Sequence, residues 1–392
     1  MILELHLLQS FPVSNLNRDD LGAPKSATFG GVPRARVSSQ ALKRAARDEF
    51  IKHGLDKTDL GDRTKRIIFA ASDLLSEDHQ ADPRATDILA AGLAGLGFGV
   101  VDTRRSQYLL FIGNKAAHAL AEYCEQNWDD LTQVVEAAEK EAKKATSKKK
   151  ANPDKDPVAA FTKSKKSKDA AATRKLLDAS YAADIGLFGR MIADNTEFNI
   201  AAASQVAHAL STHAVTTEFD YYTAVDDLKK NDEPGADMIG TIDFNTACYY
   251  RYANLDLTQL RENLAADDAL VAKAAQAWLG AFIDSTPTGK QSTTAARTMP
   301  ETLLGTVRDR GAWNLANAFL KPVTGHDLMT TSTQRLFEHF QTLRGFYGSR
   351  ALRTVAGAAL TSDTAPLPAE ERVDSLDTFT SRLLSTALDT TA

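Results

Sequence analysis

The chain has 392 residues, 43% hydrophobic and 25% charged, which is the composition of a folded protein with room for two or three domains. Its formal net charge of −5 argues against a generally basic nucleic-acid binder, although it leaves room for a local basic groove. Two cysteines, Cys124 and Cys248, exclude a disulfide scaffold and a Cys-based zinc cluster. So few cysteines also fit a reduced, cytoplasmic setting. Because no long apolar stretch occurs, we expect no signal peptide and no membrane span.

The N-terminal residues Ile2 to Leu8 alternate with period two, placing Leu3, Leu5 and Leu7 on one face. This pattern predicts a central β-strand. A loop rich in Gly and a helix follow it. Further along, Ala- and Leu-rich patterns predict helices at residues 63–75, 87–97 and 130–144. Residues 106–127 are expected to form a strand or short helix and then a helix, and Ala182 to Met191 begins with strand-like alternation.

The second half of the chain contains a predicted hairpin arm. Thr217 to Tyr222 is extended, Thr241 to Tyr252 is rich in β-formers, and between them lies a polar segment, 226–237, centred on Pro-Gly. Two extended runs around such a segment predict a long hairpin with a mobile tip. Beyond it we expect two helices, a strand, a third helix and a polar C-terminal helix or tail (residues 258–264, 267–283, 313–320, 332–345 and beyond 362). The fold class predicted is α+β.

A lysine-rich segment interrupts the middle of the chain. Between Lys140 and Lys168 there are 11 lysines against three acidic residues, with little apolar content. Such a composition cannot bury enough apolar surface to fold alone, so we expect a disordered surface insertion over about residues 140–170. A basic tail that helps to hold nucleic acid is the alternative.

Residues 15–47, which we call the basic strip, depart most clearly from the acidic background. Seven Lys or Arg and two acidic residues lie between Arg18 and Arg47. Loop glycines and Pro33 separate the first four cations, and arginine forks are suited to phosphate oxygens. These four are Arg18, Lys25, Arg34 and Arg36.

The strip ends in a predicted helix whose N-cap is Ser38 or Ser39. The start of a helix presents unpaired backbone N–H groups and favours an anion. Gln40, Lys43 and Arg47 follow three- and four-residue spacing and form one polar stripe, whereas Leu42, Ala46 and Phe50 share another face and should pack inward. The alternative is a solvated loop followed by an ordinary amphipathic helix.

Parts of a catalytic site are absent from the sequence. None of the eight histidines falls in a metal-binding pattern, and the spacing of His208 and His213 suits neither one helix stripe nor one strand face. Neither Gly30-Gly31 nor the loop Gly289 to Thr294 satisfies a phosphate-binding P-loop pattern. We therefore expect no catalytic residues, no metal and no cofactor, and a binding protein rather than an enzyme.

Several motifs resemble CasC, the repeated backbone subunit of the type I-E CRISPR surveillance complex Cascade, in the RAMP superfamily. The N-terminal matches are NLNRDD at 15–20, FGG at 29–31 and RARVSSQALKRA at 34–45. The others keep their order along the chain to about residue 320: DIGLFGRM at 184–191, AHALSTH at 207–213, TAVDDL at 223–228, YRYANL at 250–255 and ANAF at 316–319. The 140–170 segment and the C-terminal region do not match.

The resemblance implies a palm resembling an RNA-recognition motif (ferredoxin-like), a helical fingers domain and a hairpin thumb. On this chain the palm would comprise residues 1–62, 181–212 and, with C-terminal helices, 251–392; the fingers would comprise 63–180 and the thumb 213–250. It also implies that about six copies polymerise head-to-tail along the spacer of one CRISPR RNA (crRNA). Implied partners are the crRNA, target DNA paired with it, other Cascade subunits, and a helicase-nuclease recruited to the complex.

The resemblance also implies roles for individual residues. Arg18, Lys25, Ser38, Gln40, Lys43 and Arg47 would contact the RNA backbone, and Arg34 and Arg36 belong to the same predicted RNA-binding set. Arg47 replaces an expected lysine and keeps its charge. Met191 would wedge beside a displaced base, and either Met238 or Ile239 would do the same from the thumb, flipping out every sixth base.

We therefore expect a non-catalytic, crRNA-binding scaffold for RNA-guided DNA recognition in antiviral defence. The alternative is a CRISPR-associated ribonuclease of the same superfamily. That activity would need a catalytic acid at the thumb, for which Asp226 and Asp227 are the candidates.

Overall fold

The computed structural model describes residues 1–101, 104–146, 169–192, 196–224, 238–360, 364 and 366–389. Most of the lysine-rich segment and the predicted hairpin tip lie outside these residues. The chain divides into two compact units. The sheet unit comprises Met1–Leu55, Ser204–Thr258 and Ala272–Ala392, and the helical unit comprises Asp56–Ala203 and Gln259–Val271.

The sheet unit is built on a large antiparallel sheet. Its nine strands, among the described residues, follow the order β13-β12-β1-β11-β9-β3-β2, with β8 and β10 also paired to β11. Sequence-distant strands are neighbours, because β1 pairs with both β11 and β12. The strands are β1 (Ile2–Ser14), β2 (Ser26–Phe29), β3 (Val32–Val37), β8 (Ser204–Val206), β9 (Ala209–Ser211), β10 (Glu218–Ala224), β11 (Met238–Asp256), β12 (Thr302–Arg308) and β13 (Leu352–Ala359).

Helices cover both faces of the central strands. On one face, Leu8 and Leu304 pack with Phe337 and Phe340 of α13 (Leu328–Tyr347). On the other, Gly305 leaves room for Phe379 and Leu383 of α14 (Leu376–Leu388), which a Cβ there would meet within 3 Å. The strand predicted at residues 2–8 is therefore confirmed as central, and it is buried on both faces. Further elements of the unit are α1 (Ser39–Glu49), η1 (Phe50–His53), α12 (Gln291–Thr294), η4 (Leu315–Phe319) and η5 (Ala369–Glu371).

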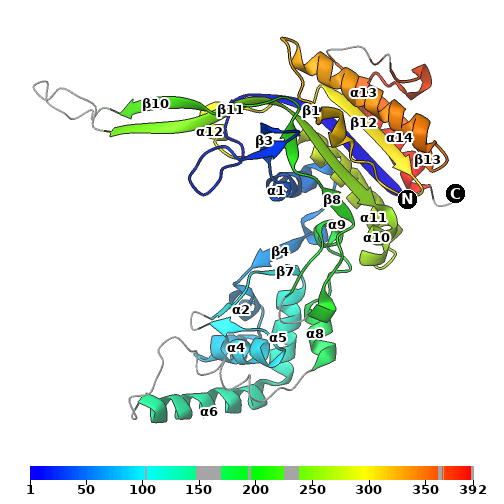
Figure 1. Cartoon of the computed structure of the whole chain (residues 1–392). Helices are drawn as coiled ribbons and strands as arrows, with labels where there is room; N and C mark the ends of the chain where they lie inside the picture. The colour runs from blue at the N-terminus through cyan, green and yellow to red at the C-terminus, as the bar shows by residue number, and fades with distance from the viewer. Residues whose placement is uncertain are drawn as a thin grey trace, which may run out of the picture. The chain divides into compact units, whose positions relative to one another are not determined.

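The predicted hairpin is confirmed in its two strands. β10 pairs antiparallel with β11, from Glu218 opposite Phe244 to Ala224 opposite Met238. The same long strand β11 continues to Asp256 in the centre of the sheet, so the arm extends directly from the sheet (Figure 1). Continuity with a buried strand gives the arm a rigid base.

The helical unit has its own apolar core, formed largely by Ala and Leu of α2, α4, α5 and α6. Asp184 is fully buried there, and its Oδ1 accepts from Gly61 N at 2.7 Å and Ile185 N at 2.9 Å. The helices are η2 (Lys57–Asp59), α2 (Ile67–Ser72), α3 (Glu77–Gln80), α4 (Ala85–Gly95), α5 (Ala116–Gln126), α6 (Trp128–Thr146), α8 (Ala170–Leu176), α9 (Ala183–Phe188) and η3 (Thr196–Phe198). Its strands are β4 (Gly61–Thr64), β5 (Val100–Val101), β6 (Arg105–Ser106) and β7 (Leu110–Gly113); α10 (Leu257–Asn263) and α11 (Asp268–Asp284) contribute to both units.

Three local predictions were wrong. Ala182 to Met191 forms helix α9 rather than a strand, and every residue of α9 is buried, so the segment lacks the polar face that marks a surface helix. Residues 63–75 contain the end of β4 before a shorter helix. Residues 313–320 contain the 3₁₀ helix η4 instead of a strand. The remaining predicted helices are present with shifted ends.

Overall the fold is mixed α and β with a large antiparallel sheet, as the predicted class requires. None of the described helices is both long and apolar enough to cross a membrane.

His6 lies inside the sheet unit and makes stability depend on pH. Its Nδ1 forms a hydrogen bond with the Tyr250 hydroxyl at 2.9 Å. Burial, followed by the nearby Arg308 charge, lowers its pKa to about 3. Between about pH 6.5 and 3, the unfolded chain therefore binds a proton that the folded chain does not, so stability falls as pH falls.

We expect the free energy of unfolding to decrease by about 2 kcal/mol more in the native protein than in His6→Gln between about pH 7 and pH 5. Glutamine can still hydrogen-bond with Tyr250, as donor or acceptor, but it does not titrate. Urea unfolding of both proteins at the two pH values measures this. An equal pH dependence in both would show that His6 does not carry the effect.

Candidate nucleic-acid interface

The loop that opens the basic strip is held by side-chain hydrogen bonds. Asn15 Nδ2 donates to Gly22 O at 2.9 Å and to Asp243 O at 3.0 Å, which ties the loop to β11. Asp19 Oδ1 accepts from two loop N–H groups, each at 2.9 Å. The loop is therefore fixed to the sheet, and Arg18, which is exposed, projects from a fixed backbone.

Arg36 and Lys25 lie on the exposed side of the strip together with His208. Arg36 Nε donates to Ser26 O at 3.1 Å, and its Nη1 lies 3.0 Å from His208 Nδ1. Since arginine only donates, His208 Nδ1 must accept, which leaves the proton of the neutral ring on Nε2. Burial first, then the charges of Arg36 and Lys25, lower the pKa of His208. The sequence alone did not assign His208 to the strip.

Arg34 has a different environment from its neighbours. Its side chain is 0% exposed. The guanidinium donates to Phe29 O at 3.2 Å, Ser211 O at 3.0 Å and Phe319 O at 2.8 Å. Arg34 thus joins the β2–β3 hairpin to β9 and η4, and burial lowers its pKa. Because it faces the interior, we correct the predicted RNA-binding set by leaving Arg34 out.

Helix α1 begins as predicted. Ser38 is its N-cap, and its hydroxyl accepts from Ala41 N at 3.3 Å. Ser38 is 5% exposed, and its hydroxyl is engaged in capping α1. Gln40 is exposed, while Lys43 and Arg47 are half-buried on the same stripe. The predicted inward face, Leu42, Ala46 and Phe50, is confirmed as buried.

The hairpin between β2 and β3 turns at Gly30 and Gly31, which have φ of 62° and 81°. Two consecutive positive φ values define the type I′ turn that suits a two-residue hairpin loop. A Cβ on Gly30 would lie 1.7 Å from Leu320 O, so only glycine fits there. Gly30, one of the glycines predicted to hold the loop, thus lets the β2–β3 hairpin pack closely against Leu320, the residue that follows η4.

A second segment approaches the strip from far along the chain. A Cβ on Gly289 would lie 2.3 Å from Leu16 O, which shows how closely the 289–294 loop packs on the start of the strip. Lys290 follows directly and is half-exposed. The sequence of this loop indicates only an incomplete phosphate-binding motif, because nothing local shows its contact with Leu16.

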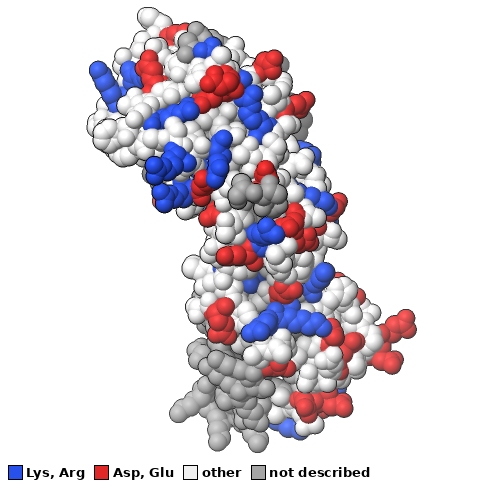
Figure 2. Space-filling model, turned by 90° about the vertical axis from the view of Figure 1, so that its right-hand side faces the viewer, with Lys and Arg blue, Asp and Glu red and all other residues white. Residues whose placement is uncertain are grey.

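Lys and Arg side chains form several clusters on the sheet unit. On the face shown in Figure 2, blue clusters lie on the upper part of the molecule, with red acidic side chains among them. A net charge of −5 over the whole chain therefore conceals local positive surface.

The hairpin arm exposes apolar side chains. Phe219 is 72% exposed, Tyr221 63% and Met238 55%. Phe219 and Tyr221 are two residues apart on β10 and so share one face. Ile239 pairs with Thr223 in the backbone register, but its side chain lies outside the described part of the structure, as do Asp226 and Asp227. The choice between Met238 and Ile239 stays a prediction.

Met191, in the helical unit, is 88% exposed between two buried neighbours. Arg190 donates through Nη2 to Leu177 O at 2.9 Å and to Phe198 O at 3.0 Å. Ile192 N donates to Asn199 Oδ1 at 2.6 Å. An apolar side chain is thus held out in solvent by an anchored backbone, which suits an apolar wedge.

No cluster of three or more His, Cys, Asp or Glu that could hold a metal ion occurs among the described residues.

Both ring nitrogens of His213 form hydrogen bonds with the backbone. Nδ1 donates to Ala214 O at 2.9 Å, and Nε2 accepts from Cys248 N at 3.1 Å.

Comparison with solved structures finds many similar chains, and two of them belong to RNA-guided surveillance complexes. One is titled "CRISPR RNA-guided surveillance complex, pre-nicking"; it is 29% identical, with a TM-score of 0.79 over 99% of this chain and 100% of that one. The other is titled "CRISPR RNA-guided surveillance complex"; it is 25% identical, with a TM-score of 0.60 over 99% and 100% of the two chains. No curated protein matches.

A protein-family model described as "CT1975-like protein" matches residues 3–382. The match covers nearly the whole chain. Together with the two structural matches it confirms the predicted resemblance to a subunit of a CRISPR surveillance complex. The chain belongs to the CT1975-like protein family.

Proposed function

We propose that this protein is a crRNA-binding backbone subunit of a Cascade-type CRISPR surveillance complex, of type I-E, and acts in CRISPR interference. The observation that carries the proposal is the basic strip: exposed and half-buried cations on a fixed loop and on α1, in an otherwise acidic chain. The family membership and the likeness to chains of RNA-guided surveillance complexes support it.

In this proposal the sheet corresponds to an RNA-recognition-motif-like palm, the helical unit to the fingers, and the β10–β11 arm to the thumb. Arg18, Lys25 and Arg36 hold phosphates, and the start of α1 adds backbone N–H groups and the Gln40 side chain. Lys43 and Arg47 extend the phosphate path along the helix. Contacts of this type read the sugar-phosphate backbone and not the sequence.

Sequence specificity then comes from base pairing between the crRNA and its target. Met191 and an apolar residue of the arm, Met238 or Ile239, displace one base at intervals. An interruption costs stacking energy, but it releases the twist that a continuous duplex would accumulate along a rigid filament. Head-to-tail contacts between copies do not close on themselves, so the RNA length and capping subunits set the copy number.

The proposed subunit is a scaffold without catalytic activity. The alternative, a ribonuclease, depends on Asp226 or Asp227. Incubation of the assembled complex with RNA complementary to the guide decides between them. Cleavage that disappears in Asp226→Ala or Asp227→Ala would show that the subunit is a ribonuclease, whereas intact RNA supports a scaffold without catalytic activity.

The direct test of the proposed function is purification after co-expression with a CRISPR array. We expect a multimer that carries RNA of uniform length, with an absorbance ratio typical of a ribonucleoprotein. A monomer with the absorbance of protein alone under these conditions would contradict the proposal.

A further inference from the structure

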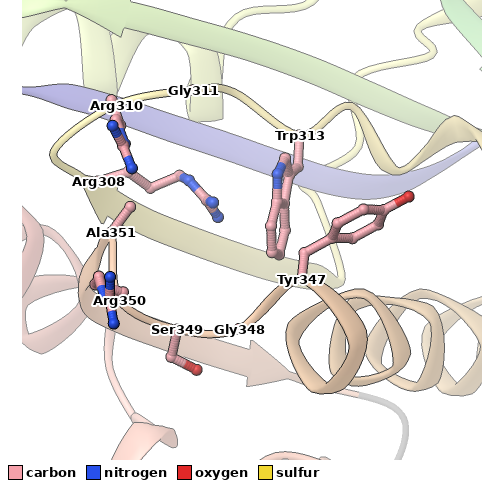
Figure 3. A pocket seen from close by; sticks show the side chains of 9 residues that line it. All are labelled: Arg308, Arg310, Gly311, Trp313, Tyr347, Gly348, Ser349, Arg350 and Ala351. Atoms are coloured by element: carbon pink, nitrogen blue, oxygen red, sulfur yellow. The ribbon is translucent and has the colours of Figure 1, made fainter.

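A pocket of about 660 Å³ lies on the sheet unit between the end of β12, the loop that follows it, and the end of α13 (Figure 3). None of its residues belongs to the basic strip or to the hairpin arm. A volume of this size falls in the range of small-molecule sites. It is lined by Arg308, Arg310, Gly311, Trp313, Tyr347, Gly348, Ser349, Arg350 and Ala351.

Arg308 is a buried cation directed into this pocket. Its side chain is 5% exposed, and among the described residues it forms an ion pair with Glu4, Nε to Oε2 at 3.6 Å. Glu4 itself accepts from Tyr252, Thr306 and Trp313 N, so its oxygens are largely engaged. Arg308 Nε and Nη1 have no hydrogen-bond partner. The buried positive charge of Arg308 is therefore incompletely paired, and it adds to the positive potential of the pocket.

The pocket also contains an aromatic wall. The Arg308 guanidinium lies 3.7 Å from the centroid of the Trp313 ring, and Trp313 lies 6.2 Å from Tyr347. Figure 3 shows Trp313 between the Arg308 guanidinium and Tyr347. Tyr347 is 69% exposed and its neighbour Phe346 is 81% exposed. Large aromatic side chains left in solvent at one place often mark a binding surface.

Two further arginines lie on the side of the pocket opposite Trp313 and Tyr347 (Figure 3). Arg310 and Arg350 are exposed, and neither side chain has a hydrogen bond or ion pair with the residues that the structure describes. The nearby Asp309 is paired with Arg353 at 2.7 Å. The C-terminal end of α13 contributes a partial negative charge, but this is smaller than the charge of the arginines. The pocket therefore favours an anion.

We infer that this pocket binds a nucleotide, with its phosphate at Arg310 and Arg350 beside the charge of Arg308, and its base against the exposed ring of Tyr347. Arginine forks match phosphate oxygens, and an aromatic wall accepts the face of any base, so recognition would be of the phosphate and the ring rather than of one base. The nucleotide is either free or one unit of a nucleic-acid strand. The inference is independent of the function proposed for the basic strip.

Titration of the full chain, freed of RNA, with AMP tests the inference by calorimetry. We expect AMP to bind with one site per chain, and Arg310→Ala/Arg350→Ala to weaken it at least about tenfold. Both residues are exposed, so this variant keeps the fold. Arg105→Ala/Arg174→Ala is the matched control, because it removes two exposed arginines from the helical unit. It should bind AMP as the native protein does.

Further titrations separate the parts of the site. Tyr347→Ala should weaken AMP but not inorganic phosphate, and equal binding of phosphate and AMP by the native protein would overturn the role of the aromatic wall. Lys43→Glu/Arg47→Glu, altered only in the basic strip, should keep AMP binding. If AMP does not bind but a short single-stranded oligonucleotide binds and loses affinity in Arg310→Ala/Arg350→Ala, the nucleotide belongs to a strand. If neither ligand responds to that variant, the inference is wrong.

Discussion

Replacing Lys43 and Arg47 together by glutamate is expected to reduce crRNA loading and filament formation at least about tenfold, while the isolated subunit stays folded. Both side chains are half-buried on the outward stripe of α1, opposite the buried face of Leu42 and Ala46. If α1 holds the RNA as proposed, charge reversal replaces two phosphate contacts by repulsion. The RNA that co-purifies with the tagged protein measures loading, and circular dichroism measures folding.

A matched control exists on the same segment. Arg44 and Lys52 lie off this stripe and pair with Asp48 at 3.8 Å and Glu49 at 2.7 Å. Arg44→Glu/Lys52→Glu changes the net charge by the same amount, yet should keep most of the RNA. Equal losses in the two variants would mean that overall charge, and not the stripe, governs loading. Normal RNA recovery in Lys43→Glu/Arg47→Glu would remove α1 from the interface.

Arg34→Met is expected to lower the free energy of unfolding by about 3 kcal/mol. The substitution keeps an apolar stem of similar length, but it leaves the buried carbonyls of Phe29, Ser211 and Phe319 without their donor. The free energy of unfolding of Arg34→Lys should lie between those of the native protein and Arg34→Met, since one ammonium group cannot reach the same set of carbonyls as a planar guanidinium. Urea unfolding of the subunit without RNA gives the measurement.

Arg36→Met provides the comparison for Arg34. Arg36 is two residues away and half-exposed, and it contacts one carbonyl and His208. Its replacement should change stability by less than about 1 kcal/mol but should weaken RNA loading. The opposite pattern, with a stable Arg34→Met that loses RNA, would return Arg34 to the interface and assign the structural role to Arg36.

The N-terminal segment, residues 2–50, shows how far local patterns determine this protein. The period-two alternation at residues 2–8, the serine cap at Ser38 and the inward face of α1 were all readable from the sequence, because each depends on neighbours within one turn or one strand. The hairpin arm was readable for the same reason. By contrast, α9 was misassigned because full burial removed its amphipathic pattern.

The sequence alone determined which residues carry positive charge and which segment gathers them, since these depend only on residue type and order. Only the tertiary structure decided which of those cations face solvent. Arg34 and Arg36 lie two residues apart on β3 and therefore point to the same face, so the difference lies in what surrounds each. Carbonyls of Ser211 on β9 and Phe319 on η4, which are 177 and 285 residues away in sequence, enclose Arg34. Long-range packing of this kind also assembles Arg308, Trp313 and Tyr347 into one pocket, and no local pattern reports it.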